Sequence, residues 1–239
     1  MSNERHRNQE PEDGKLPEPD QDRALESAIA EFGGSLSPDG TGDGDEDPPD
    51  YAECFRSLEE KARELGILYD RWQPAVEGGR EHDLTYDELS GTCLKFTKPA
   101  KAAYMVDFDL GYPSLAPALP IQYLERQVLH NAVFADAIRF VGVAGDPYFR
   151  RIVTRQPHIH GRAASWEQII RLMVDELGFR KLRHNYGIGY EDSYGFVRAD
   201  IAVFDLRPAN VILTDSGIIV PIDSIPVRLS DQTREMFTD

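Results

Sequence analysis

The stretch FDLRPANVILTDSGIIVPIDS, residues 204–224, decides how the rest of the chain is interpreted. It holds Asp205, then Asn210 five positions later, then Asp223 after two short apolar runs. Thr-Asp-Ser-Gly at 214–217 separates the two runs and is typical of a hairpin turn. The pattern therefore predicts a polar loop and a returning strand that carry the three polar side chains.

Carboxylate and amide oxygens suit Mg²⁺, and a separate carboxylate can accept the proton of a hydroxyl group. Phosphoryl transfer from ATP needs both functions, because the protein must hold the metal ion, neutralise the phosphates and orient the acceptor. In a kinase catalytic loop the general base and the metal-binding asparagine stand five positions apart. The same spacing here predicts Asp205 as the base and Asn210 and Asp223 as Mg²⁺ ligands. An exposed turn followed by an aspartate at a strand end is the alternative interpretation.

The run DLRPAN and the later Asp223 resemble the D-L-K-P-x-N and D-F-G pattern of protein kinases, including the distance between the two motifs. This resemblance gives Arg207 the place of a lysine that contacts the transferred phosphate. The flanks depart from that pattern, with Val203-Phe204 before the base and Ser224-Ile225 after the second aspartate. Only 16 residues follow Asp223, so we expect neither a large helical substrate-binding lobe nor a phosphorylation-controlled activation loop.

An ATP site of this kind also needs a lysine on a strand, paired with a glutamate on the following helix. Lys95 lies in the alternating segment TCLKFT, and Glu125 lies in the helical segment that follows. We expect these two side chains to form an ion pair beside the nucleotide, with Lys98 as the competing lysine. An exposed strand lysine and a helix-surface glutamate are the alternative.

Two further segments are candidates for contacts with the nucleotide. The turn at Gly78-Gly79 could let backbone N–H groups approach the phosphates, although it lacks the G-x-G-x-x-G spacing. Gln156 and His158 would lie at a hinge that presents backbone groups to adenine. His158 and His160 form an H-x-H pair, but no third ligand stands at a known spacing, which disfavours zinc.

A narrower resemblance extends over roughly residues 70–230. It is carried by GGREHDLTYD, CLKFTKP, IQYLERQVLHNAVFAD, IRFVGVA, IVTRQPHIHG and DLRPANVILTDSGIIVPID. Together these runs are similar to the serine/threonine/tyrosine kinase-like domain of phage and plasmid polyvalent proteins. The resemblance implies a compact, truncated, bilobal kinase-like fold, with a small β-rich N-lobe at about 70–155 and a reduced C-lobe at about 160–239.

The acidic residues are unevenly distributed. The net charge is −16, of which residues 1–50 contribute −11 through 15 acidic and 4 basic side chains. This segment is rich in Pro, Gly, Asp and Glu, so we expect an acidic, largely disordered tail, in which a short helix through Leu25, Ile29 and Phe32 could form, at least transiently. Such acidity argues against a nucleic-acid-binding tail.

Hydrophobic periodicity predicts an α+β fold for residues 51–239. The expected elements are a helix over 51–65, a β-meander over 76–98, a loop over 109–117, a helix over 119–138, strands over 139–156, a helix over 166–177 and strands over 195–206 and 209–224. No apolar run approaches the length of a membrane helix, and two cysteines without metal-ligand spacing fit a reducing cytoplasm.

The sequence thus predicts an ATP- and Mg²⁺-dependent phosphotransferase acting on a hydroxyl acceptor, with a protein as the expected acceptor and no nucleic-acid or membrane partner. Two alternatives stay open. One is a nucleotide-binding pseudokinase that serves as an interaction module. The other is a small-molecule kinase of the aminoglycoside-phosphotransferase kind, since VPID also resembles the aspartate-bearing strand of those enzymes.

Overall fold

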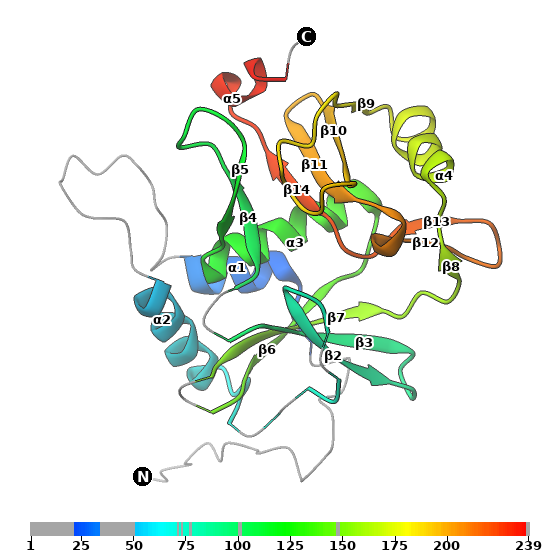
Figure 1. The fold of residues 1–239 in the computed structure, drawn as a ribbon. Coiled ribbons are helices and arrows are strands. Elements are labelled where there is room, and N and C mark those ends of the chain that lie inside the picture. The colour runs from blue at the N-terminus through cyan, green and yellow to red at the C-terminus, as the bar shows by residue number, and fades with distance from the viewer. Residues whose placement is uncertain are drawn as a thin grey trace, which may run out of the picture. The chain divides into compact units, whose positions relative to one another are not determined.

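The computed structural model (Figure 1) describes residues 22–33, 51–70, 72, 74–76, 78–99, 102–146 and 149–237. The expectations for residues 1–21 and 34–50 lie outside this range. The helices are α1 Leu25–Gly33, α2 Tyr51–Glu64, α3 Pro120–Phe134, α4 Trp166–Ile170 and α5 Asp231–Glu235, with a π-helical turn at Arg171–Glu176 and a 3₁₀ turn at Pro208–Asn210. Among the described residues, every helix is too short or too polar to span a lipid bilayer.

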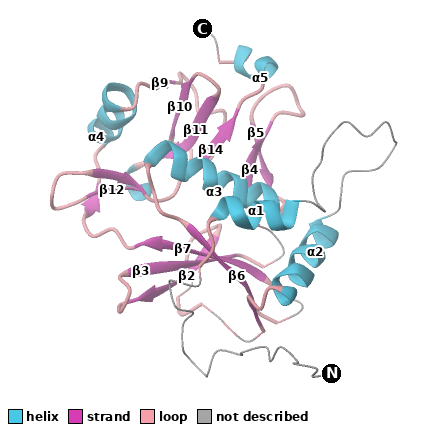
Figure 2. Cartoon of the chain, turned by 180° about the vertical axis from the view of Figure 1, so that it is seen from behind, coloured by secondary structure: helices cyan, strands magenta, loops and turns pink. Residues whose placement is uncertain are grey.

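The strands follow one another in runs between these helices and form small sheets, as the two cartoon views show (Figures 1 and 2). They are β1 Leu68–Tyr69, β2 His82–Asp87, β3 Thr92–Thr97, β4 Tyr104–Asp107, β5 Ser114–Pro117, β6 Arg139–Ala144, β7 Arg151–Pro157, β8 Arg162–Ala163, β9 Arg180–Lys181, β10 Tyr194–Arg198, β11 Ile201–Leu206, β12 Val211–Leu213, β13 Ile219–Pro221 and β14 Ile225–Arg228. The predicted α+β class is confirmed.

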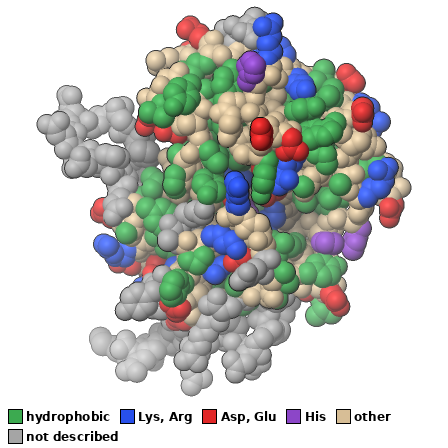
Figure 3. Space-filling model, viewed as in Figure 1, with side chains coloured by type: hydrophobic (Ala, Val, Ile, Leu, Met, Phe, Trp, Pro, Cys, Tyr) green, Lys and Arg blue, Asp and Glu red, His purple; other side chains and the backbone are tan. Residues whose placement is uncertain are grey.

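The chain forms two compact units whose segments interleave in the sequence. Unit 1 comprises the chain up to residue 103 together with 119–124 and 138–156. Unit 2 comprises 104–118, 125–137 and the chain from 157 onward. On the viewed face, acidic and basic side chains are interspersed (Figure 3), which agrees with a net charge of only −5 outside residues 1–50.

Unit 1 is built on a five-stranded sheet with the order β1-β6-β7-β3-β2. The predicted β2–β3 hairpin is confirmed, with Leu84 opposite Lys95. Its alternating pattern buries Leu94 and Phe96, while Lys95 lies half-buried between them in the sequence. The predicted helix is confirmed as α2, which packs beside β6 and ends at Glu64, two residues before the left-handed Gly66 with φ +71°.

Helix α1 departs from the expectation of an unpacked tail. Leu25 and Phe32 are buried, and the Phe32 ring lies 5.4 Å from that of Phe140 on β6. The buried Asp22 carboxylate pairs with Arg155 at 2.5 Å. The expectation of a largely disordered tail is therefore wrong for residues 22–33, because an apolar stripe and a buried ion pair offset the chain entropy that the composition alone would leave uncompensated.

Unit 2 contains three smaller sheets, in the orders β14-β11-β10-β9, β13-β12-β8 and β4-β5. The segment 109–117, expected as a loop, instead completes the β4–β5 hairpin, with Asp107 opposite Ser114. Strands of four residues are too short to show alternation, and the turn residues dominate this stretch. Two apolar clusters form the core, and the adjacent residues Val203 and Phe204 of β11 belong one to each.

The helix predicted over 166–177 forms and begins with a capping box, in which Ser165 and Gln168 satisfy each other's backbone N–H groups. It is α-helical only to Ile170 and continues as a π-helical turn. The Leu177 N–H bonds to the carbonyl of Leu172, the five-residue spacing of a π-helix.

Candidate active site

Asp205 and Asn210, the predicted base and metal ligand, lie in contact within unit 2. Strand β11 ends at Leu206, and the 3₁₀ turn Pro208–Asn210 reverses the chain into β12. The Asn210 side-chain amide donates to the Asp205 backbone carbonyl at 2.8 Å and to its carboxylate at 3.0 Å. The five-residue spacing therefore closes a compact loop, with Asn210 buried inside it.

The backbone of Asp205 is left-handed, with φ +57°. Aspartate adopts this conformation more readily than most residues, but within a strand it still carries strain. This conformation directs the carboxylate into the loop, where the Asn210 amide and the N–H of Tyr190 both donate hydrogen bonds to it. Strained backbone of this kind is concentrated at functional sites.

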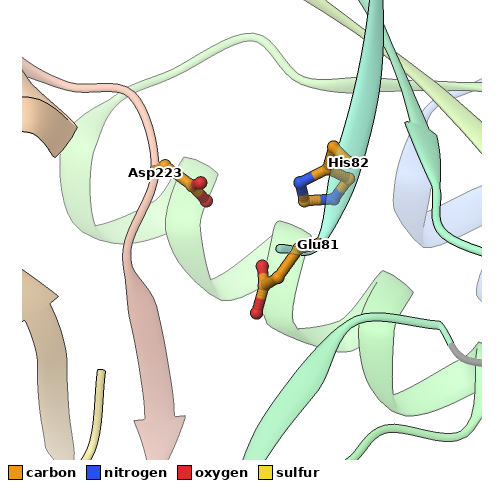
Figure 4. A group of neighbouring side chains, drawn as sticks. All are labelled: Glu81, His82 and Asp223. Atoms are coloured by element: carbon orange, nitrogen blue, oxygen red, sulfur yellow. The ribbon is translucent and has the colours of Figure 1, made fainter. Parts of the chain in front are cut away.

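The hairpin β12–β13 returns Asp223 to the same place. Val211 pairs with Pro221, and the N–H groups of Ile222 and Asp223 reach the Asn210 carbonyl at 2.9 and 3.4 Å. Asp223 lies just beyond β13 (Figure 4), and its side chain is 40% exposed. One carboxylate thus stays accessible beside the buried asparagine.

Burial raises the pKa of Asp205, and the negative charge of Asp223 raises it further. The N–H of Tyr190, the Arg207 guanidinium and the Asn210 amide lower it, but the net shift is upward. A carboxylate with a raised pKa holds a transferred proton better than an ordinary aspartate does, which suits a general base.

Arg126 of α3 is a site residue that the sequence did not suggest. It is buried, and its guanidinium lies 3.6 Å from the Asp223 carboxylate. The same side chain donates to the carbonyl of Ser224 at 3.2 Å and to that of Tyr104 at 2.7 Å. No motif spacing links α3 to the loop after β13. The one signal in the sequence is a charged residue, Arg126, placed among the apolar residues of the helix.

The loop 185–193 also reaches the site. The Tyr190 N–H donates to the Asp205 carboxylate at 3.2 Å, and the Arg207 guanidinium lies 3.7 Å from the centre of the Tyr190 ring. Arg207 Nε is 3.9 Å from the same carboxylate. The glycine-containing run YGIGYEDSYG leads into β10, and no motif in it indicates the contact with Asp205.

The predicted nucleotide contacts fall partly in unit 1. Lys95 lies on β3 in unit 1, whereas the exposed Glu125 lies on α3 in unit 2. Their ion pair therefore stays a prediction. Gln156 is buried at the end of β7, and the rings of His158 and His160 lie 4.4 Å apart. Their hinge role also stays a prediction.

The segment around Gly78 is fixed by contacts of its own. The Gly78 N–H donates to the Asp83 carboxylate at 2.9 Å, and a Cβ at Gly78 would lie 2.2 Å from the carbonyl oxygen of His82, the first residue of β2 (Figure 4). Gly79 has open space around its Cα. The competing lysine, Lys98, forms an ion pair with Asp83.

Residues 114–230 match the family model described as serine/threonine/tyrosine kinase found in polyvalent proteins. No curated protein and no solved structure matches the chain. The matched segment contains Glu125, Asp205, Arg207, Asn210 and Asp223, and it begins after β2 and β3.

The suspected resemblance is thereby confirmed over the part of the chain that holds the Asp205 loop and the Asp223 strand. Residues 114–230 are similar to the serine/threonine/tyrosine kinases found in polyvalent proteins.

Proposed function

We propose that the chain is an ATP-dependent phosphotransferase that moves the γ-phosphate to a hydroxyl group, with a protein as the acceptor. The observation that carries this proposal is the arrangement of Asp205, Asn210 and Asp223. One turn and one returning strand bring a buried asparagine into contact with the first carboxylate and place the second beside it. The kinase family of residues 114–230 supports the same chemistry.

The donor set fits Mg²⁺. The Asn210 amide nitrogen faces two acceptors on Asp205, and this orients the other atom of the amide, Oδ1, away from them. Oδ1 and the half-exposed Asp223 carboxylate are hard oxygen ligands of the type this ion prefers. When bound between them, Mg²⁺ would neutralise charge on the ATP phosphates.

Asp205 would act on the acceptor. Its carboxylate accepts the hydroxyl proton as the acceptor oxygen bonds to the γ-phosphorus, and the bond from that phosphorus to the β,γ-bridging oxygen breaks to leave ADP. The N–H of Tyr190 and the Asn210 amide hold this carboxylate in place from two sides. Held in this way, it needs little reorganisation to take the proton.

Arg207 would contact the transferred phosphate. Its Nε is shielded from solvent and has no hydrogen-bond partner among the described residues. A buried N–H of a guanidinium normally has a hydrogen-bond acceptor, because a buried donor without one costs free energy. A phosphate oxygen beside Asp205 would supply that acceptor.

On the nucleotide side, Lys95 would contact the α- and β-phosphates and Glu125 would hold it there. Gln156 and His158 would lie near adenine. Gly78 and Gly79 would approach the phosphates, although the Gly78 N–H already donates to Asp83. Because of this bond, we assign the lysine the larger share of the phosphate binding.

The experiment is incubation of the full chain with radiolabelled ATP and Mg²⁺, beside the variants Asp205→Asn and Asp223→Ala. The acceptors would be generic protein substrates in one arm and a panel of small hydroxyl compounds in the other. Transfer to protein by the wild type alone supports the proposal. Transfer to small molecules alone would identify a small-molecule kinase, and nucleotide binding without transfer would identify a pseudokinase.

A further inference from the structure

The loop 185–193 lies between β9 and β10 in unit 2, and its residue Tyr190 makes three kinds of contact. The N–H of Tyr190 donates to the Asp205 carboxylate at 3.2 Å. Its ring lies under the Arg207 guanidinium at 3.7 Å. Its carbonyl accepts hydrogen bonds from the side chains of Asn185 at 3.0 Å and Ser193 at 2.7 Å.

These carbonyl contacts fix the loop in one conformation. Ser193 is buried, and its hydroxyl lies near both the Tyr190 carbonyl and that of Ile188. Ile188 is fully buried in the core cluster that also contains Phe204, the residue before Asp205. The loop is therefore anchored to the same strand that carries Asp205, and Tyr190 is held at a fixed place over the site.

Gly189 makes the approach possible. Its φ is +82°, and a Cβ at this position would lie 2.2 Å from the Asp205 Oδ1 atom. Any other residue would push the loop away from the carboxylate. Gly187, two residues earlier, also has positive φ, at +74°, but a Cβ there would meet nothing within 4 Å. Only Gly189 is constrained by the carboxylate itself.

From these contacts we infer that Tyr190 is a positioning residue for phosphoryl transfer. Its N–H orients the carboxylate that takes the acceptor proton, and its ring holds the arginine that contacts the transferred phosphate. A single residue outside the D-x-x-x-x-N segment would thus set the distance between the proton acceptor and the phosphate site. This inference rests on the proposed phosphotransferase function.

The ring contact also explains how Arg207 stays in place without a hydrogen bond from its Nε. A guanidinium over an aromatic face is held by the ring quadrupole and keeps its N–H groups available in its own plane. A flexible arginine would instead have to be ordered at each turnover, at an entropic cost.

Gly189→Ala is the decisive variant, and Gly187→Ala is its matched control, because both add a methyl group at a left-handed glycine of the same loop. With radiolabelled ATP and the protein acceptor, we expect Gly189→Ala to lower kcat by about 10- to 100-fold, with KM for ATP changed less than twofold. Gly187→Ala should stay within about twofold of wild type in kcat. Equal losses in the two variants would overturn the inference.

Hydrogen exchange gives a second readout that does not depend on turnover. The Tyr190 amide should be protected in the wild-type chain and in Gly187→Ala, and should exchange faster in Gly189→Ala and in Asp205→Ala, since its acceptor is displaced or removed. Equal exchange of this amide in wild type and Asp205→Ala would also refute the inference.

The ring contact is tested separately. Tyr190→Phe keeps the aromatic face and should keep kcat, whereas Tyr190→Leu should lower kcat by about threefold to tenfold. Tyr186→Leu removes an equally exposed tyrosine of the same loop and should leave kcat unchanged. If the wild type transfers no phosphate at all, the proposed function fails and the inference fails with it. If the wild type transfers phosphate but the Gly189 and Tyr190 variants match their controls, only the inference fails.

Discussion

The side-chain amide of Asn210 donates to both oxygens that Asp205 turns toward it, the backbone carbonyl at 2.8 Å and the carboxylate at 3.0 Å. The contact joins two residues five positions apart and buries the asparagine. It gives Asn210 two tasks, since its nitrogen holds the base and its oxygen would face the metal.

Asn210→Ala should therefore reduce stability as well as activity. Two buried acceptors on Asp205 would lose their donor, which costs about 1–3 kcal/mol of unfolding free energy. Asn210→Asp should cost at least as much at pH 7, because it places a second carboxylate against Asp205. Urea unfolding of both variants measures the effect. A stability equal to that of wild type in Asn210→Asp would contradict the contact.

Asp223→Ala should weaken Mg²⁺-dependent nucleotide binding and leave the fold intact, because the side chain is 40% exposed and its buried partner Arg126 keeps its bonds to two backbone carbonyls. Titration with a fluorescent ADP analogue, with and without Mg²⁺, measures the affinity. The control is Asp215→Ala, which removes an exposed aspartate at the tip of the same hairpin. Unchanged Mg²⁺-dependent affinity in Asp223→Ala would exclude this residue as the ligand.

Lys95→Met and Lys98→Met should have opposite profiles. Lys95→Met should lower the transfer rate by on the order of 10²-fold, because a positioned phosphate contact is lost, with little change in melting temperature. Lys98→Met should keep the rate but destabilise the chain by about 1–3 kcal/mol, because Lys98 is a partner of the buried Asp83 carboxylate. A Lys98 variant that is stable but inactive would show that the two lysines have been assigned in the wrong order.

The stability of the chain should fall at acid pH through Asp83. Burial alone would raise the pKa of this carboxyl, but hydrogen bonds from Lys98, the Gly78 N–H and Arg151 lower it to about 2. A depressed pKa in the folded state stabilises the protein above the ordinary value near 4, and this stabilisation is lost as the pH falls toward 2. Its full size is roughly 2 kcal/mol.

Unfolding free energies of wild type and Asp83→Asn, measured at pH 7 and pH 3, test this. The difference between the two proteins should shrink by about 1 kcal/mol at the lower pH. A difference that is independent of pH would mean that Asp83 is not the titrating group.

Phe32→Ala should destabilise the chain by about 3–5 kcal/mol, as expected for a buried aromatic side chain that packs on Phe140. Glu26→Ala, an exposed position on the same helix, should have almost no effect. Deletion of residues 1–45 should likewise lower the melting temperature, since it removes α1 and the Asp22–Arg155 pair. An unchanged melting temperature after deletion would show that α1 does not contribute to folding.

The parts of the site that the sequence predicts are those whose geometry is local. Asp205 and Asn210 are in contact because a single 3₁₀ turn follows Asp205 and ends at Asn210. Asp223 lies beside Asn210 because the short β12–β13 hairpin folds the chain back. The strands and helices with clear periodicity were also predicted, including the helix that follows Ser165.

The parts that the sequence did not reveal depend on long-range packing. Arg126 lies 97 positions before Asp223, and Tyr190 lies 15 before Asp205, with no repeated spacing to connect them. The docking of α1 was missed for a related reason, since an acidic, Pro- and Gly-rich surrounding sequence concealed a stripe of only three buried apolar residues, Leu25, Ala28 and Phe32. Burial of such residues is decided by the partner surface and not by the local pattern.

The interleaving of the two units has a consequence for synthesis. Unit 1 is complete only when the ribosome has passed residue 156, and it must form around two intervening segments, 104–118 and 125–137, that belong to unit 2. The residues of unit 2 against which those segments pack are synthesised later, so the apolar side chains of the two segments stay exposed during translation. Neither unit corresponds to a contiguous fragment, and bisecting the gene at any single point should yield two pieces that aggregate when expressed separately.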